Sequence, residues 1–247
     1  MGGVAGCAIG VMAKAPQPGR SKTRLCPPLE PEQAARLSEA FLRDMFGIIA
    51  RAARQAPIAG YAAYAPFGTE AQVAALLPPG MGLVLADGTS PMPPGVHGFG
   101  RCLLHAVQGM LARGHPTACV LNSDSPTLPV SALVQAAQAL LAPGERIVLG
   151  AAEDGGYYLL GMQRPHARLF ADIAWSTGKV AEASRNRAAE LGLDVVELPA
   201  WYDVDDAASL LRLMQSIGAD NPDPYPAPAT QAALRRLGLF AMPAAAE

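Results

Sequence analysis

A buried strand and a polar turn meet in Cys119-Val120-Leu121-Asn122-Ser123-Asp124-Ser125-Pro126. The first three residues are apolar, and the polar residues after them break the run abruptly. Asp124 is therefore predicted at the carboxyl end of a strand. In open α/β sheets ligands bind at this edge, because the loops that leave the strands diverge there and share a crevice.

A carboxylate in that position suits Mg2+ or Mn2+ held together with a nucleotide diphosphate. Hard cations take oxygen ligands from one or two carboxylates and from the phosphates themselves. Asp and Ser are also common in turns and helix caps, so on this stretch alone two other roles stay open. Asp124 would then order the turn or cap a helix that begins near Val130.

Length and composition predict a single α/β domain. A chain of 247 residues can bury a substantial core, and although 51% of its residues are hydrophobic, no apolar run reaches the roughly 20 residues that a membrane span needs. The net charge of -2 and the pI near 6.1 disfavour a nucleic acid polymer as partner. The four cysteines are scattered without a C-x-x-C pattern, which is typical of reduced thiols in a cytoplasmic protein.

The apolar run 6–13 predicts the first strand, and a basic loop follows it. The loop reads Lys14-Ala15-Pro16-Gln17-Pro18-Gly19-Arg20-Ser21-Lys22-Thr23-Arg24-Leu25. It matches neither a Walker loop nor G-x-G-x-x-G, and a solvated loop is the alternative to a binding site. Arg presents a planar fork and Lys a compact charge, so the pattern suits a pyrophosphate. We expect Lys22 and Arg24 nearest the phosphates, because apolar Leu25 should anchor that end.

Beyond this loop, strands and helices alternate as in a βαβ fold. Helices are predicted at 31–54, 69–77, 101–113, 130–141, 179–191 and 207–217, and strands at 58–65, 82–86, 146–150 and 194–198, with an aromatic strand after residue 156. The long loop 87–100 includes residues 95–101, which could contact a base or a sugar. We expect one domain over 1–219 and a peripheral Pro/Ala-rich tail over 220–247, with a short helix at 230–239.

Two further acidic segments follow predicted strands. Glu153 and Asp154 precede Gly155 and Gly156, whose backbone freedom would let a tight turn present the acids to the crevice. A hairpin turn with its acids in water is the alternative. Asp203, Asp205 and Asp206 precede the last amphipathic helix; we expect Asp205 or Asp206 to cap it and the others to be free for a metal.

Five motifs together resemble a bacterial family labelled arsenosugar biosynthesis glycosyltransferase-like, within the nucleotide-diphospho-sugar transferase superfamily. They are Ala13-Lys14-Ala15-Pro16 with Pro18-Gly19 and Lys22-Thr23-Arg24-Leu25, Ser123-Asp124-Ser125-Pro126, Glu153-Asp154-Gly155-Gly156-Tyr157, Trp175-Ser176-Thr177, and Asp203-Val204-Asp205. The resemblance runs from about Ile9 to about Met214. The chain departs from the family pattern at His97-Gly98-Phe99-Gly100-Arg101 and at Gly178, where members usually have proline.

The resemblance implies a single-domain, Rossmann-like glycosyltransferase type-A (GT-A) fold, a mixed and mostly parallel sheet with helices on both faces. It implies a nucleotide-sugar donor, a small-molecule acceptor and Mg2+ or Mn2+. Expected metal ligands are Asp124, Asp203 and Asp205; expected donor-binding residues are Lys14, Gly19, Arg20, Lys22, Arg24, Ser123, Gly155 and Gly156. We expect Asp154 to be the acceptor-side base, with Glu153 orienting it or the sugar.

The same superfamily contains nucleotidyltransferases, such as molybdenum cofactor guanylyltransferase, so fold alone does not fix the chemistry. Pro16 and Pro18 stand where those enzymes carry a Gly-Gly-x-Ser/Thr-Arg run, which favours sugar transfer. A non-catalytic sugar-nucleotide binding module is the third alternative. Two sets of carboxylates beside a basic loop argue against it, because unpaired acids in a crevice cost stability unless a ligand uses them. The oligomeric state, a homo-oligomer included, stays open.

Overall fold

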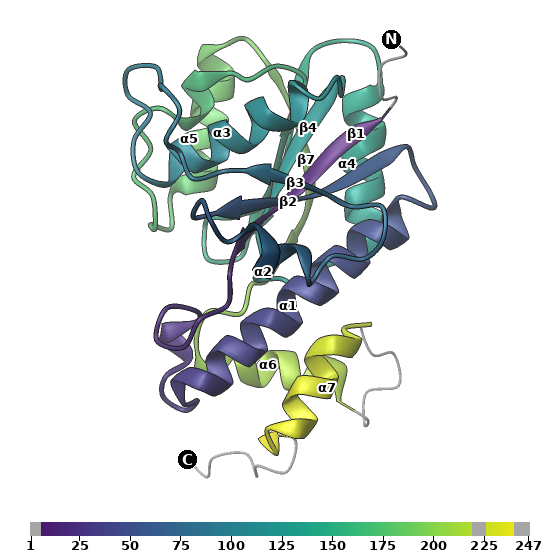
Figure 1. The fold of residues 1–247 in the computed structure, drawn as a ribbon. Helices are drawn as coiled ribbons and strands as arrows, with labels where there is room; N and C mark the ends of the chain where they lie inside the picture. Colours follow the sequence, from purple (N-terminus) through teal and green to yellow (C-terminus); the bar gives the residue numbers. More distant parts are fainter. Residues whose placement is uncertain (1–5, 219–225, 240–247) are drawn as a thin grey trace.

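A seven-stranded mixed sheet forms the centre of the molecule (Figure 1). The computed structural model describes residues 6–218 and 226–239. The strands are β1 Cys7–Lys14, β2 Ile58–Ala65, β3 Gly82–Leu85, β4 Thr117–Leu121, β5 Arg146–Ala152, β6 Tyr157–Met162 and β7 Asp194–Trp201. Their order is β3-β2-β1-β4-β6-β5-β7, and only the pairs that include β6 are antiparallel. The predicted mixed, mostly parallel α/β sheet is confirmed.

Helices cover both faces of the sheet. They are α1 Pro31–Ala52, α2 Glu70–Ala74, α3 Phe99–Leu111, α4 Val130–Leu141, α5 Val180–Glu190, α6 Ala207–Ile217 and α7 Pro228–Arg236, with 3-10 turns at Thr23–Leu25 and Ala167–Phe170. Side chains alternate across a strand, so Ile9 and Val11 of β1 pack in the cluster with α1 and α4, whereas Ala8 packs in the cluster with α3 and α5. Two apolar cores therefore hold the sheet between the helix layers.

Helix α1 is longer than the sheet needs, and its first half builds a third apolar cluster with α6 and α7. Leu25, immediately after the basic loop, is fully buried in this cluster beside Phe41 of α1. The predicted anchor of the loop is thus in place. It fixes the position of the cations that precede Leu25.

The tail contains a helix, α7, that packs on α1 (Figure 1). The buried carboxylate of Asp44 accepts hydrogen bonds from the backbone N–H groups of Ala229 (3.0 Å) and Thr230 (2.7 Å) at the start of α7. Burial raises the pKa of Asp44 against these hydrogen bonds. Residues 220–225 and 240–247 of the expected tail lie outside the described residues, and the division at residue 219 stays a prediction.

Strand β7 continues to Trp201, three residues past its predicted end at Leu198. Pro199 favoured a stop there, because proline cannot donate to a ladder. β7 is an edge strand, however, and on its open side no N–H is needed. This extension carries the chain back towards the middle of the sheet edge, where Asp203 and Asp205 follow.

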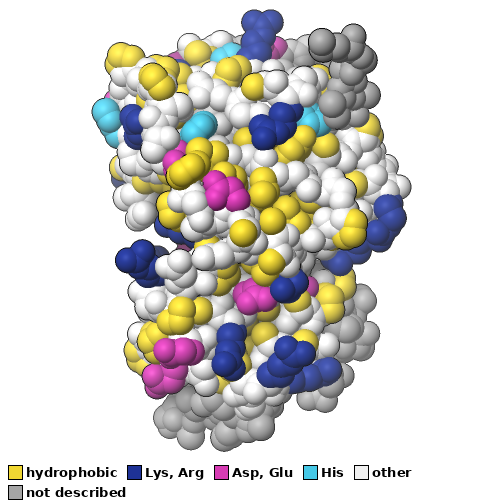
Figure 2. Space-filling model, viewed as in Figure 1, with side chains coloured by type: hydrophobic (Ala, Val, Ile, Leu, Met, Phe, Trp, Pro, Cys, Tyr) yellow, Lys and Arg dark blue, Asp and Glu magenta, His cyan; other side chains and the backbone are white. Residues whose placement is uncertain are grey.

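Within the described residues, no helix has both the length and the apolar character required to cross a membrane. The space-filling view shows Lys and Arg side chains scattered among acidic and apolar ones on the face that it draws (Figure 2). The four cysteines are free thiols, two of them, Cys7 and Cys119, fully buried.

Candidate functional site

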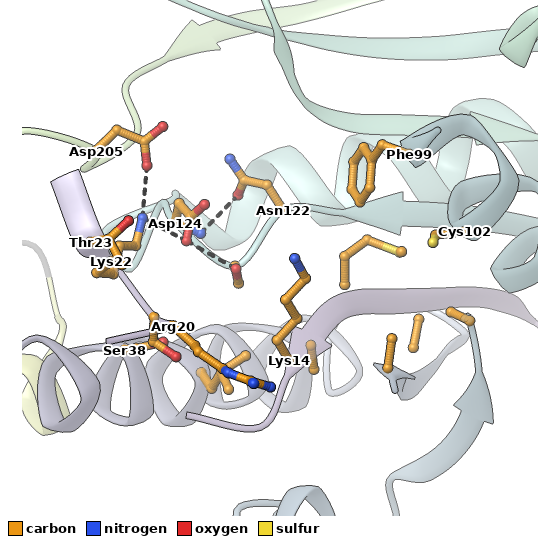
Figure 3. Close-up of a pocket in the computed structure, with 18 of the residues that line it drawn as sticks. Lys14, Arg20, Lys22, Thr23, Ser38, Phe99, Cys102, Asn122, Asp124 and Asp205 are labelled. Atoms are coloured by element: carbon orange, nitrogen blue, oxygen red, sulfur yellow. Dashed lines mark hydrogen bonds and ion pairs between the residues drawn. The ribbon is translucent and has the colours of Figure 1, made fainter. Parts of the chain in front are cut away.

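A cavity of about 640 Å³ opens at the carboxyl edge of the sheet. It lies between the loop after β1, the start of α3, the loop after β4 and the segment after β7 (Figure 3). The lining residues expected from the sequence are Lys14, Arg20, Lys22, Arg24, Ser123, Asp124 and Asp205. Because β1 and β4 are parallel neighbours, their ends meet, and the basic loop and Asp124 come together as predicted.

Lys22 is the most enclosed cation of the site. Its Nζ lies 2.8 Å from Asp124 Oδ1, 2.8 Å from Asp205 Oδ1 and 2.7 Å from the carbonyl oxygen of Val204 (Figure 3). Burial acts to lower the pKa of Lys22, but the two carboxylates outweigh it and raise that pKa overall. The ammonium group of Lys22 is thus surrounded by three oxygens. We call these oxygens, from Asp124, Asp205 and Val204, together with the Lys22 ammonium group, the Lys22 cage.

The backbone of the basic loop is shaped to place Lys22 there. Gly19 has a φ of 70°, and the N–H groups of Arg20 and Ser21 both donate to the carbonyl of Gln17. Lys22 itself has a φ of 49°, a left-handed conformation that is uncommon outside glycine. The buried Leu25 and the ring of Phe41, whose centre lies 5.6 Å from Lys22 Nζ, hold the far side.

The other three cations of the loop are more exposed. Within residues 6–218 and 226–239, Lys14 and Arg20 have no acidic partner, and both line the cavity; Lys14 points into it (Figure 3). The Arg24 side chain is 74% exposed and lies 3.9 Å from Asp205. The structure therefore divides the loop, with Lys14 and Arg20 available to an anion and Lys22 and Arg24 facing carboxylates. The sequence had predicted Lys22 and Arg24 nearest the phosphates.

Asp124 is fixed by its own turn and by the segment after β7. Its Oδ1 accepts a hydrogen bond from Ser123 Oγ (2.9 Å), and its backbone carbonyl accepts one from the N–H of Val204 (2.9 Å). The residue at the cap position of α4 is Pro129, so Asp124 does not cap that helix. Of the two roles left open beside metal binding, only that of ordering the turn remains.

The three acids after β7 have separate surroundings. Asp206 caps α6 by accepting from Ser209 N (2.8 Å), as expected for one of the acids, and Asp205 joins the Lys22 cage. Burial, followed by the charges of Asp154, Asp205 and Asp124, raises the pKa of Asp203 to about 6. Asp203 is therefore the carboxylate that lies within electrostatic reach of both acidic segments.

The turn after β5 does not line the cavity. Arg212 of α6 forms an ion pair with Glu153, and its hydrogen bond lowers the pKa of Glu153. Asp154 Oδ1 accepts a hydrogen bond from the N–H of Gly156 (2.8 Å), the turn-capping contact held open as an alternative. Gly155 has a φ of 88°, and a Cβ there would lie 2.1 Å from the carbonyl of Gly178, so this glycine is needed for packing.

Apolar and neutral residues line the rest of the cavity, among them Phe99 from the predicted segment 95–101. Phe99, at the first turn of α3, is 45% exposed and meets Trp175 edge to face with ring centres 5.8 Å apart. Ala63, Ala86, Asn122 and Ser38 are among the other residues of this part. The sequence pointed to residues 95–101 and to Trp175. It could not identify Ser38, a polar residue within the long helix α1, or the carbonyl oxygen of Val204, which belongs to the backbone, because neither group has a sequence motif.

In the described ranges, no three side chains of His, Cys, Asp or Glu are gathered in a metal-binding arrangement. Of the predicted trio, Asp124 and Asp205 both contact Lys22, and Asp203 does not line the cavity. The Lys22 cage nevertheless consists of two carboxylates and a carbonyl around one positive charge, and this donor set suits a hard divalent cation.

A family model of bacterial proteins described as "Uncharacterized protein conserved in bacteria (DUF2064)" matches residues 48–177, just over half of the chain. The chain belongs to this family. Among solved structures, it is similar to a "putative nucleotide-diphospho-sugar transferase" from Desulfovibrio desulfuricans G20. The two are 26% identical with a TM-score of 0.76, over 95% of this chain and 96% of the other. The superfamily predicted from the five motifs is confirmed.

More distant structures share the fold alone. A CMP:2-keto-3-deoxy-manno-octonic acid synthetase complexed with CTP is 15% identical with a TM-score of 0.52, over 85% of this chain and 97% of the other. A cytidylyltransferase from Leptospira borgpetersenii serovar Hardjo-bovis is 9% identical with a TM-score of 0.54, over 98% of each chain. No curated protein matches the chain.

Proposed function

We propose that this protein is a transferase that binds a nucleotide-diphospho-sugar in the cavity at the sheet edge and transfers the sugar to a small acceptor. The observation that carries the proposal is a pairing of opposite charges across one cavity. Lys14 and Arg20 line it without acidic partners among the described residues, and Asp124 and Asp205 line it beside them. A diphosphate with a bound divalent cation has the charge pattern that fits both sets.

In this proposal Lys14 and Arg20 hold the two phosphates. Lys14 is the last residue of the buried strand β1, and Arg20 lies in a hydrogen-bonded turn, so neither cation needs a large rearrangement to reach an anion in the cavity. Gly19 and Ser123 shape the loops on which these contacts depend, and Arg24 adds a peripheral positive charge. The glycines at 155 and 156 act through the packing of their turn, away from the cavity.

Asp124 and Asp205 would hold Mg2+ or Mn2+, with Asp203 beside them. When bound, such a cation neutralises charge on the departing diphosphate. On the acceptor side, we assign Asp154 as the base that takes the acceptor proton if the transfer inverts configuration, because an inverting displacement needs a base opposite the leaving group. Glu153, held by Arg212, would orient Asp154 or the sugar.

Nucleotidyl transfer is the second candidate, because cytidylyltransferases share the fold. The two reactions differ in the bond that breaks, sugar C1 to phosphate oxygen in one and the α-phosphate linkage in the other. Pro16 and Pro18 in the phosphate loop favour sugar transfer. The superfamily match at 26% identity supports the same choice through the description of that relative.

Thermal shifts with UDP-sugars, GDP-sugars, CTP and GTP, each with and without Mn2+, test the proposal. Stabilisation by a nucleotide-sugar that grows with Mn2+ is expected, since a ligand that binds only the folded state raises the melting temperature. Stabilisation by a nucleoside triphosphate alone would favour nucleotidyl transfer. If a nucleotide-sugar binds but is not turned over with any acceptor in a library, water included, the result would favour a non-catalytic binding module.

A further inference from the structure

The three donors of Lys22 are fully used by three oxygens from two distant parts of the chain. Asp124 lies in the turn after β4, and Val204 and Asp205 lie after β7. The Lys22 side chain is 8% exposed, and the ring of Phe41 covers its other side. Within the described residues, Lys22 is the cation that joins the turn after β4 to the segment after β7 (Figure 3).

These oxygens are also the ones that the proposed function gives to the divalent cation. Mg2+ and Mn2+ bind oxygen at about 2.0–2.3 Å, closer than the ammonium contacts in the cage. A metal ion bound to the same Oδ1 atoms would lie only about 4 Å from the ammonium nitrogen, and the like charges would repel each other strongly even at a screened dielectric. Each cation therefore weakens the binding of the other.

We propose that Lys22 is a built-in competitor for the divalent cation, so that metal binds the cage weakly until a diphosphate gives Lys22 another partner. A cation that enters alone expels Lys22 towards Lys14 and Arg20, which already line the cavity. A diphosphate held by those residues offers Lys22 phosphate oxygens instead. Metal and diphosphate binding are then positively linked, and the linkage is reciprocal. This inference rests on the proposed diphosphate and metal ligands.

The first test compares Mn2+ binding, without nucleotide, in wild type, Lys22→Met and Lys179→Met by titration followed with electron paramagnetic resonance. Both variants remove one lysine charge, but Lys179 is exposed and does not line the cavity, whereas Lys22 occupies the cage. We expect Lys22→Met to bind Mn2+ at least about tenfold more tightly than wild type, and Lys179→Met to stay within about threefold. Equal affinities in the two variants would overturn the proposal.

The same titration with UDP present gives the linkage. UDP should raise the Mn2+ affinity of wild type by a larger factor than that of Lys22→Met, because the variant has no lysine to relocate. If neither wild type nor Lys22→Met binds UDP in the presence of Mn2+, the proposed function fails. A gain of Mn2+ affinity in Lys22→Met alone would still support the competition in that case, so the two failures are distinguishable.

A measurement on the wild-type chain covers the possibility that Lys22→Met does not fold. The chain has three lysines, Lys14, Lys22 and Lys179, so acetylation by dilute acetic anhydride can be followed at each by mass spectrometry. Lys179 is exposed, does not line the cavity and serves as the internal reference. Lys22 should react slowly at first, at least about fivefold faster with saturating Mn2+ alone, and slowly again after UDP is added. A Lys22 rate that Mn2+ leaves unchanged contradicts the displacement.

Discussion

The acidic segments after β4 and after β5 differ in position. Asp124, after β4, lies in a cavity with the basic loop, whereas Glu153 and Asp154, after β5, do not line that cavity. The sheet order explains the difference: β4 is the direct neighbour of β1, but β6 separates β4 from β5. Strand position alone is not sufficient, however, because Asp205 follows the edge strand β7 and still lines the cavity.

Asp203 connects the two segments. Its pKa is raised first by burial and then by the charges of Asp154, Asp205 and Asp124, so it responds to both acidic groups. Tyr202 and Val204 on either side are buried, which places Asp203 and Asp205 on the same, more exposed side of the segment after β7. The segments after β4 and β5 are therefore separated in space, but both act electrostatically on Asp203.

The largest effect is expected from Asp124→Ala. The substitution removes a carboxylate of the cage and leaves Lys22 with Asp205 and the Val204 carbonyl. Mn2+-dependent binding of the nucleotide-sugar should fall by a factor of about 100 or more, which corresponds to about 3 kcal/mol. Isothermal titration with and without Mn2+ measures it. Glu153→Gln, in the other acidic segment, is the matched control and should keep the metal-dependent part; an unchanged metal dependence in Asp124→Ala removes that residue from the metal site.

Asp154→Asn tests the segment outside the cavity. Asparagine keeps an oxygen that can accept from the N–H of Gly156, so the turn is preserved while the base is lost. If Asp154 is the acceptor-side base, turnover should fall about a hundredfold with little change in nucleotide-sugar affinity. Initial rates and titrations on the same preparation separate the two quantities. If Asp154→Asn keeps the wild-type turnover rate, Asp154 is not the base and serves only to stabilise its turn.

Much of the fold was predictable from local pattern. The bounds of β2, α4 and α6 agree with the predicted ranges 58–65, 130–141 and 207–217, because each has a clear apolar period or run and a clear terminating signal. The predicted end of β7 was wrong. Pro199 lies in an edge strand at a register shift between β5 and β7, where proline is tolerated, and neither the order of strands nor the shift is a local property of the sequence.

The site was predictable in its residue types and less so in its pairings. Asp124 and the basic loop were expected to meet, but the Lys22 cage joins residues 182 and 183 positions apart, and one of its three oxygens is a backbone carbonyl. Neither feature has a signature in residue order. For the same reason the loop cations could be counted from the sequence, but the division between Lys14 with Arg20 and Lys22 with Arg24 could not.

That division predicts unequal effects within one loop. Arg20→Ala should weaken nucleotide-sugar binding about tenfold or more, because a charge-assisted contact to phosphate contributes roughly 1.5–3 kcal/mol. Arg24→Ala should weaken it by less than about threefold, because its side chain is largely exposed and faces Asp205. Titration of both variants with UDP and with uridine gives the comparison. The sequence alone favoured the opposite order, so a larger loss for Arg24→Ala would restore that interpretation.

The smallest expected effect concerns stability and pH at Asp203. Its pKa is raised in the folded state from 3.8 to about 6, so ionisation is easier in the unfolded chain. The ionisation of Asp203 therefore lowers the free energy of unfolding. This destabilisation is absent below about pH 4, grows between about pH 4 and pH 6, and is complete above about pH 6. Asp203→Asn cannot ionise and should therefore gain stability relative to wild type, by about 1 kcal/mol at pH 7.5, with no gain at pH 4.

Urea unfolding of both proteins in EDTA at the two pH values measures this gain. Asp206→Asn gives the opposite sign: hydrogen bonds from Ser209 lower the pKa of Asp206, so that carboxylate stabilises the fold at neutral pH and loses its effect as the pH falls below about 4. Because Asp154 is the first charge acting on Asp203 after burial, the gain from Asp203→Asn should shrink in an Asp154→Asn background. Full additivity of the two substitutions would mean that the acidic segments are electrostatically separate as well as spatially apart.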